Sequence, residues 1–427
     1  SDTHLGFARG TPRGEDAFFN FKQAMEGIAA QQPDAIIFPG DFFDHKIPIQ
    51  EVWDEAFQIF RLIQHAPSSE VKITHHPRGN VAPEPFRFHG IPFVGIAGTH
   101  EYRSKDLKNA FHVLRTGGFL LNLHASHCEI QKELPNGEME KVCIHGMAGI
   151  PEKRALEALK MFNPKPISNA HNLLVLHQSI KEFLPSKDDM VATIGLSDLP
   201  NGFDLLLNGH LHWTTITEWD GKKLLIPGST VFTQMKRLES KKQKGWYIYD
   251  TQTRQLEMHF IPIQRKLYYH LFKFTNETPV NVMQTIRDAV EKDFSIAHPI
   301  PPLVRIKIKG TLAKGYTSSD VDLNATLLPF QEKAIFSCMK KFENEKFSVK
   351  LEELRARHRE NANLSKVGLE LLEKNLHQTP FANKMDMPRL VELLEDKQNV
   401  EQAIRLLEGG ELVSPPEEEK ENSSSSS

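Results

Sequence analysis

Short apolar runs alternate with amphipathic segments from the start of the chain to about Asp250. Apolar residues recur at helical spacing at 17–30, 52–65 and 106–116. Strands that alternate with helices in this way predict an α/β layered core whose strands are buried on both faces. The runs that have the length of buried strands lie at 34–38, 91–96, 172–176, 203–207 and 223–226.

A different pattern follows Asp250. Residues 267–274 have the pattern of a strand, 280–293 that of a helix, and 304–309 that of a strictly alternating strand with one exposed face. This succession predicts a small α+β domain. We place it at 261–345, after a main domain at 1–260.

The last part of the chain is charged and helical in pattern. Its apolar stripes, at 349–359 and 388–407, are too thin to make a core of their own, which favours a helical extension at 346–408 that binds a partner. The tail at 409–427 is rich in glutamate and serine and is predicted to be disordered.

Composition limits the class of protein. The 427 residues are 39% hydrophobic and 25% charged, which is typical of a soluble globular protein. No apolar run approaches the roughly 18 residues of a membrane span, so no membrane association is expected. The 3 cysteines lack metal-type spacing, which predicts free thiols in an intracellular, reducing compartment. A net charge of −3 argues against non-specific duplex binding unless cations gather on one face.

Metal-competent side chains follow the apolar runs. In an open α/β sheet, ligands gather beyond the carboxyl ends of the strands, so residues far apart in sequence converge there. Each motif alone has an ordinary explanation, such as a turn for Gly-Asp or a core histidine after a strand, but their combination favours a metal site. The residues concerned are Asp2 and His4 at the chain start, Asp41, Thr99 and His100, His177, and the pair His210 and His212.

These residue types suit two divalent ions. Carboxylate and imidazole together favour manganese, iron or zinc over calcium, and the absence of thiolate ligands argues against a structural zinc site. A carboxylate such as Asp41 can bridge two ions that lie about 3.5–4 Å apart, and such a pair activates a water and clamps phosphate oxygens. His100 would then serve as a general acid at the leaving oxygen.

The order Asp-x-His, Gly-Asp, Gly-x-His, His and Gly-His-x-His resembles the calcineurin-like metallophosphoesterase superfamily. More narrowly, the chain resembles the Mre-eleven/SbcD nucleases of double-strand-break repair. That likeness covers roughly residues 1 to 310. It rests on Asp2-Thr3-His4-Leu5-Gly6 with Arg13 and Asp16, Gly40-Asp41-Phe42-Phe43-Asp44, Leu176-His177-Gln178 and Pro227-Gly228-Ser229-Thr230.

The resemblance implies a four-layer αββα sandwich with a capping domain and two ions, most simply Mn²⁺. Asp2, His4 and His212 would hold one ion, His177 and His210 the other, and Asp41 would bridge them. The implied activities are 3′–5′ exonuclease and single-strand endonuclease on DNA. The implied partners are a second copy of the chain and a Rad-fifty/SbcC-type ATPase bound by the C-terminal helices. The protein would then be DNA-associated, in the nucleus of a eukaryote or the nucleoid of a prokaryote.

The chain departs from the family pattern in two places. The family has asparagine where this chain has Thr99, and a hydroxyl is a shorter and weaker ligand than an amide oxygen. A strand is also expected before Asp2, so we expect the given sequence to be truncated, with Asp2 and His4 poorly anchored.

Other features have weaker claims to a function. The irregular segment 65–90 predicts a long loop, with His75 and His76 exposed in it. His124 and His127, beside Cys128, have metal-like spacing but no second ligand pair. Clusters of cations are candidates for contacts with a phosphate backbone. They are Lys236 and Arg237, the run Lys241, Lys242 and Lys244, and the alternating Arg305, Lys307 and Lys309.

Three functions remain open from the sequence. A repair nuclease fits the cap and the helical extension. A small-molecule phosphodiesterase or phosphatase could use the same site, and a non-catalytic scaffold could retain a weakened one, for which Thr99 is the only support. The helices at 52–64 and 106–116 would either form a dimer contact or simply cover the sheet.

Overall fold

A computed structural model describes residues 1–103, 107–184, 193–342, 393, 402 and 404. The chain divides into two units, Ser1–Lys341 and Phe342–Ser427. The predicted helical extension and disordered tail lie outside the described residues, apart from those three isolated positions. No helix of the described part is long and apolar enough to cross a membrane.

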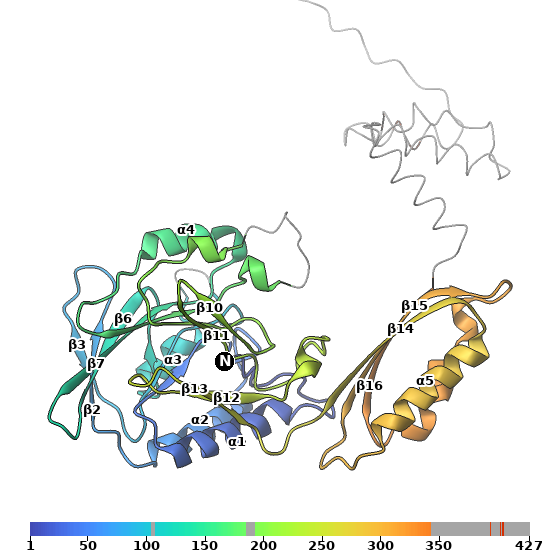
Figure 1. The fold of residues 1–427 in the computed structure, drawn as a ribbon, viewed down its shortest axis with the longest axis horizontal. Helices are drawn as coiled ribbons and strands as arrows, with labels where there is room; N and C mark the ends of the chain where they lie inside the picture. The colour runs from blue at the N-terminus through green and yellow to red at the C-terminus, as the bar shows by residue number, and fades with distance from the viewer. Residues whose placement is uncertain (104–106, 185–192, 343–392, 394–401, 403, 405–427) are drawn as a thin grey trace, which may run out of the picture. The chain divides into compact units, whose positions relative to one another are not determined.

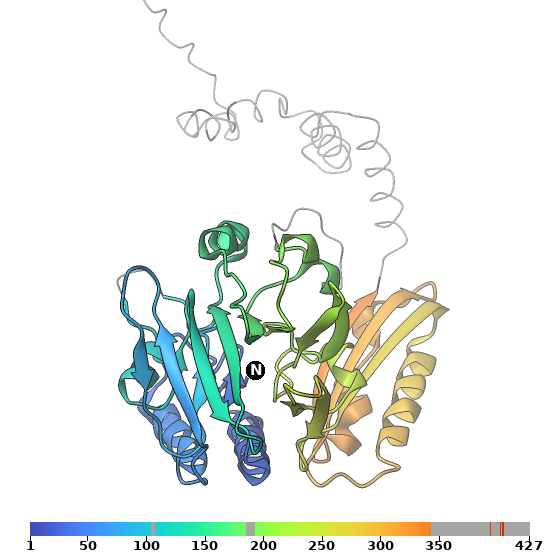
Figure 2. The same ribbon diagram turned by 60° about the vertical axis from the view of Figure 1, so that its left-hand side comes forward.

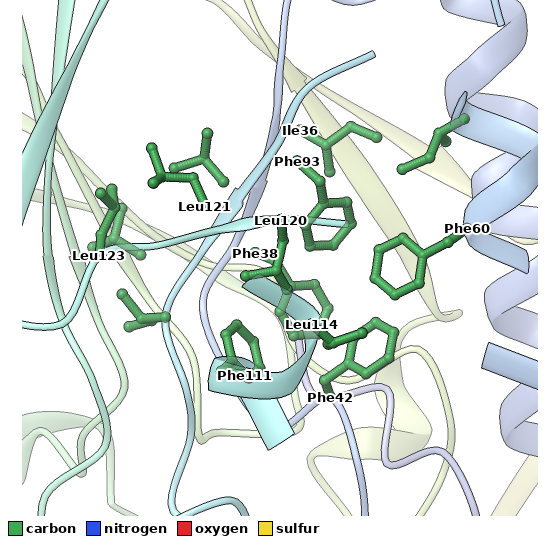
Figure 3. Packing of buried hydrophobic residues seen from close by; sticks show 14 of the residues in the cluster. Ile36, Phe38, Phe42, Phe60, Phe93, Phe111, Leu114, Leu120, Leu121 and Leu123 are labelled. Carbon is green, nitrogen blue, oxygen red and sulfur yellow. The ribbon is translucent and has the colours of Figure 1, made fainter. Parts of the chain in front are cut away.

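One sheet of the main domain is small, parallel and flanked by helices. Its strands run in the order β1 (Ile36–Phe38), β4 (Phe93–Gly95) and β5 (Leu121–Asn122). The accompanying helices are α1 (Asp16–Gln31), α2 (Gln50–Gln64) and α3 (Ala110–Thr116). Aromatic rings fill the space between these elements (Figure 3), among them Phe38, Phe42, Phe60, Phe93 and Phe111.

The second sheet is larger and mixed, and it has a helix on its other face. Its strand order is β10-β11-β9-β8-β7-β6-β2-β3, in which β7, β8, β9 and β11 are parallel neighbours. The bounds are β2 Val71–His76, β3 Glu84–Phe86, β6 Ser126–Glu133, β7 Met139–Met147, β8 His171–Leu176, β9 Leu205–Asn208, β10 Thr215–Trp219 and β11 Lys222–Ile226.

The two sheets share one core, and a second core lies under α4 (Glu152–Phe162). The shared core joins Phe21 of α1 to Leu173 and Leu205 of the large sheet. Ala155 and Leu159 of α4 belong to the second core. The helices α1 and α2 therefore lie on one side of the strands and α4 on the other (Figures 1 and 2). The predicted α/β sandwich is confirmed.

The part of the chain that was predicted to form the cap follows the hairpin of β12 (Gly245–Tyr249) and β13 (Leu256–Phe260). It contains a three-stranded sheet in the order β14 (Leu267–Glu277), β15 (Leu303–Leu312) and β16 (Ile335–Phe342). The helices of this part are α5 (Pro279–Asp293) and α6 (Leu323–Leu327). The strand, helix and alternating strand expected from the sequence are all present. On β15 the side chains of Ile306 and Ile308 are buried and alternate with the half-buried Arg305 and Lys307 and the exposed Lys309.

Contacts tie the cap to the main domain at its first residues. The Arg265 guanidinium donates to Asp16 of α1 at 2.8 Å and to the Pro12 carbonyl at 3.0 Å. Phe232 of the main domain packs with Leu267 and Leu303 of the cap.

Two local expectations from the sequence are wrong. The segment 65–90 is not a loop, because β2 and β3 form the edge of the large sheet there. His75 is only 1% exposed, since it occupies the inward position of a strand in which Val71 and Ile73 are also buried. Its Nδ1 lies 3.1 Å from Glu84 Oε1, so a charged partner on the neighbouring strand compensates the burial of the ring. Helix α3 is also shorter than 106–116, because the Asn109 side chain caps it by accepting from the His112 amide at 3.0 Å.

Candidate metal centre

Four strand ends deliver the candidate ligands to one place. Asp41 follows β1, His100 follows β4, His177 follows β8, and His210 and His212 follow β9. The glycines before them allow the loops to approach closely. A Cβ on Gly98 would overlap Asp41 Oδ1, and one on Gly40, which has a φ of +95°, would meet the His177 ring.

The chain start is held firmly against the loop after β1, contrary to expectation. The Asp2 amide donates to the Gly40 carbonyl at 2.9 Å, the His4 amide to Asp41 at 3.2 Å, and the Leu5 amide to Phe42 at 2.8 Å. Asp2 is 0% exposed and His4 1%. The backbone hydrogen bonds to residues 40–42 supply the anchoring that was expected to be missing.

The candidate ligands fall into two adjacent groups. Ligand atoms of Asp2, His4 and His212 lie within 4.8 Å of one another, and so do those of Asp41, His177 and His210. Asp41 lies between the groups, with Oδ2 at 3.1 Å from His177 Nε2 and 4.0 Å from His4 Nε2. The grouping matches the division into two ion sites that the resemblance implies. Coordination itself stays a prediction.

The donor atoms point their lone pairs at one another. His177 Nδ1 donates to the Pro39 carbonyl at 2.7 Å, which leaves a lone pair on Nε2 facing the Asp41 carboxylate. That Nε2 is buried and has no hydrogen-bond partner. His4 Nε2 and His212 Nε2 lie 3.2 Å apart, so at most one proton can separate them. Converging buried lone pairs are costly unless a cation lies between them, so the residues fit divalent ions.

Electrostatics agrees with this donor set. Burial opposes charge on His177, but the Asp41 carboxylate outweighs it and raises the pKa of His177 to about 9. Burial and the neighbouring His177 lower the pKa of His210, and burial and His4 lower that of His212 well below its usual value. A proton on His177 Nε2 and a divalent cation are alternatives beside the Asp41 carboxylate. A bound cation would replace that proton and use the lone pair of Nε2.

His100 lies at the open side of the site. Its side chain is 42% exposed. Its amide donates to Asp41 Oδ1 at 2.8 Å and its Nδ1 donates to the Asp44 carbonyl at 2.7 Å. Because Nδ1 is engaged, Nε2 is the ring atom left to exchange a proton with a substrate.

Two acidic residues of the site were not assigned a role from the sequence. Asp44 Oδ1 lies 3.2 Å from His4 Nδ1, and the Asp44 carbonyl accepts from His100 Nδ1 at 2.7 Å, so Asp44 orients both rings. Its place in the run Gly40 to Asp44 was the available signal. Glu101 accepts from the Phe43 and Gly98 amides, each at 2.7 Å, and joins the loops after β1 and β4. Burial, with Asp41 nearby, raises the pKa of Glu101 to about 7, and nothing in the sequence distinguishes it from a solvated glutamate.

One member of the basic cluster is not a surface residue. Lys244 is 4% exposed, and its Nζ donates to the His212 carbonyl at 2.7 Å, to Ser229 Oγ at 2.8 Å and to Glu239 Oε1 at 3.1 Å. The expectation that it contacts a phosphate backbone is therefore wrong, because its charge is already used to hold His212. Lys241 and Lys242 are exposed.

Thr99 lies directly before His100 and is half-buried. We expect Thr99→Asn to raise metal affinity and hydrolytic activity, because an amide oxygen reaches further and is a better ligand than a hydroxyl. Manganese titration by calorimetry, together with a hydrolysis assay, measures both. Thr99→Ser is the matched control, since it keeps a hydroxyl. Unchanged affinity and activity in Thr99→Asn would show that this side chain does not reach an ion.

The sequence model of calcineurin-like phosphoesterases matches residues 1–214, and the chain belongs to that family. Calcineurin-like phosphoesterases use a dinuclear divalent metal site.

The more specific likeness is to repair proteins. The chain is 26% identical over 242 residues to the DNA double-strand break repair protein Mre11 of Archaeoglobus fulgidus, which is 54% of this chain and 48% of that protein. It is 25% identical over 321 residues to Mre11 of Sulfolobus acidocaldarius, covering 73% and 74%. It is 24% identical over 270 residues to the double-strand break repair protein MRE11 of Gallus gallus, covering 57% and 38%. The chain thus spans about half the length of the first relatives that it matches.

Proposed function

We propose that the protein is a metal-dependent nuclease that cuts DNA in double-strand-break repair. The observation that carries the proposal is the pair of buried ligand groups on either side of Asp41. Asp2, His4 and His212 hold one ion, and His177 and His210 hold the other, with Thr99 beside it. Two divalent ions held by these residues, most simply manganese, would activate a water as the nucleophile and would neutralise charge on the phosphate oxygens. The relatives named for break repair support DNA as the substrate.

His100 supplies the proton in this proposal. Its side chain is 42% exposed, and the Asp44 carbonyl holds the ring through Nδ1, which leaves Nε2 to meet a substrate. Protonation of the leaving oxygen by Nε2 completes the cleavage of the phosphodiester. Asp44 and Glu101 act on the ring and on the loops, so both are positioning residues.

The finer assignments follow from the same likeness. The proposed activities are those of a 3′–5′ exonuclease and a single-strand endonuclease. The proposed partner is a Rad-fifty-type ATPase, bound through the C-terminal helices. Arg305, Lys307 and Lys309 share the solvent side of β15 and offer a phosphate contact on the cap. Binding of single- and double-stranded DNA at graded salt concentrations tests that contact.

A homodimer through α2 and α3 is also part of the proposal. Most of the apolar face of α2 covers the core, with Val52, Ile59 and Phe60 buried. Ile49 before α2 and Val113 of α3 remain 52% and 48% exposed, so apolar surface is left for a second copy. Sedimentation analysis over a concentration series distinguishes monomer from dimer.

The decisive experiment is manganese-dependent digestion of end-labelled duplex DNA. We expect cleavage by the wild type and a loss of about 10²- to 10⁴-fold in His100→Ser, the usual contribution of a general acid. His124→Ser, at an exposed histidine outside the centre, is the control and should cleave normally.

Two results would contradict the proposal. Hydrolysis of bis(p-nitrophenyl) phosphate without cleavage of DNA would indicate a small-molecule phosphodiesterase. Absence of bound metal by elemental analysis, with no hydrolysis of either substrate, would indicate a scaffold.

A further inference from the structure

A further group of metal-competent side chains lies outside the metal centre, on β2 and β6 near one edge of the large sheet. Atoms of His76, His127 and Glu129 lie within 4.8 Å of one another, and the group shares no residue with the two groups of the metal centre. Two imidazoles and a carboxylate are the donors that zinc and similar borderline divalent ions accept.

The strand register explains why these residues meet. His76 of β2 pairs directly with His127 of β6, and their rings stack with centroids 4.4 Å apart. Glu129 lies two residues beyond His127 and so points to the same face. Cys128, between them, points the other way into the shared core and is 0% exposed. The group therefore forms on a rigid pair of antiparallel strands.

One donor atom of the group, on His76, has no partner in the protein. His76 Nε2 is buried without a hydrogen-bond partner, although Glu129 Oε1 lies 3.6 Å away. Donors around a tetrahedral zinc lie about 3.4 Å apart, as zinc–nitrogen bonds of about 2.0–2.1 Å require. The separation of these two atoms thus suits a shared cation better than a direct hydrogen bond.

Neighbouring side chains support the arrangement. His145 of β7 stacks on the other side of His127, with centroids 5.0 Å apart, and is 3% exposed. Lys141 Nζ is 2.8 Å from Glu129 Oε2, which leaves Oε1 as the free carboxylate oxygen.

We propose that His76, His127 and Glu129 form a third metal site, which binds a divalent ion such as zinc. The bound ion would link strand β2 to strand β6. The three protein donors would leave a fourth position of a tetrahedral ion for a water. The ion would have a structural role, since it cross-links the strand pair that carries β3 at the sheet edge.

Zinc stoichiometry tests the proposal. The full chain is dialysed against micromolar zinc, and bound metal is counted by elemental analysis. His127→Ala and Glu129→Gln should each bind one ion fewer per chain than the wild type. His124→Ala, at an exposed histidine before β6, should bind as many as the wild type.

Thermal unfolding gives an independent readout. Micromolar zinc should raise the melting temperature of an Asp41→Asn variant, whose main centre is expected to bind ions more weakly, and the added Glu129→Gln substitution should reduce that increase. Because Glu129→Gln keeps the shape of the side chain, loss of folding is a small risk, and circular dichroism checks it.

The proposal is overturned if all variants bind the same number of ions, or if the additional ion binds only at millimolar zinc. Hydrolysis of bis(p-nitrophenyl) phosphate should be unchanged in His127→Ala. Unchanged hydrolysis would show that the third site is independent of the proposed nuclease centre. The proposal of a third site can therefore be wrong while the nuclease proposal holds, and the reverse is also true.

Discussion

Replacing Asp41 by asparagine is expected to lower phosphodiester hydrolysis more than about 100-fold. Substitutions around metal ligands commonly cost about 10- to 100-fold, and a carboxylate placed between both ligand groups should cost more than that. Asparagine keeps an oxygen to accept the His100 amide but removes the negative charge that faces His177 and His4. Calorimetric manganese titration should show weakened binding of both ions.

Asp54→Asn is the matched control, because Asp54 is exposed on α2 and accepts only from Gln58. It should retain wild-type affinity and rate. If Asp41→Asn bound both ions as tightly as the wild type, Asp41 would not be the bridge, and the assignment of the two groups would have to be revised.

The second large effect concerns stability. Lys244→Met should lower the free energy of unfolding by about 3–5 kcal/mol, because removing one partner of a buried ion pair leaves the other charge uncompensated. Glu239, the partner at 3.1 Å, is 2% exposed and cannot be solvated without rearrangement. The hydrogen bonds to the His212 carbonyl and to Ser229 are lost as well. Urea unfolding measures the change.

A double variant isolates the ion pair. Lys244→Met with Glu239→Gln should regain much of the lost stability, since no unpaired charge remains. Lys242→Met, on the exposed part of the same run, should change stability by no more than about 0.5 kcal/mol. A loss below about 1 kcal/mol in the single variant would contradict this account of Lys244.

The sequence predicted the parts of the fold in which periodicity and burial agree. The strands that precede Asp41, His177 and His210 are continuous apolar runs. Both the presence of these strands and the polar residues at their carboxyl ends could therefore be predicted. The β2 strand could not, because a histidine at an inward position interrupts the apolar alternation after Ile73. The stabilising partner of that histidine, Glu84, lies across a turn that the sequence does not reveal.

The sequence likewise predicted those parts of the site that depend on local pattern. Strand ends indicate which ligands converge, but they do not indicate which charged residues are buried behind them. Glu101 and Lys244 act through backbone amides and carbonyls of distant loops, and such contacts leave no trace in local spacing. The pairing of His76 with His127 likewise depends on strand register, which becomes known only when β2 is placed beside β6.

The backbone at the centre has a consequence for the stability of the chain. Asp2, His4, Asp41 and His210 all have positive φ, between 46° and 74°, where side chains other than glycine are disfavoured. Each such residue costs on the order of 1–3 kcal/mol. If these four residues hold ions as proposed, metal binding offsets this backbone cost. Exchanging one of them for glycine would relieve the strain and remove a ligand at once, so stability and metal affinity would change in opposite directions.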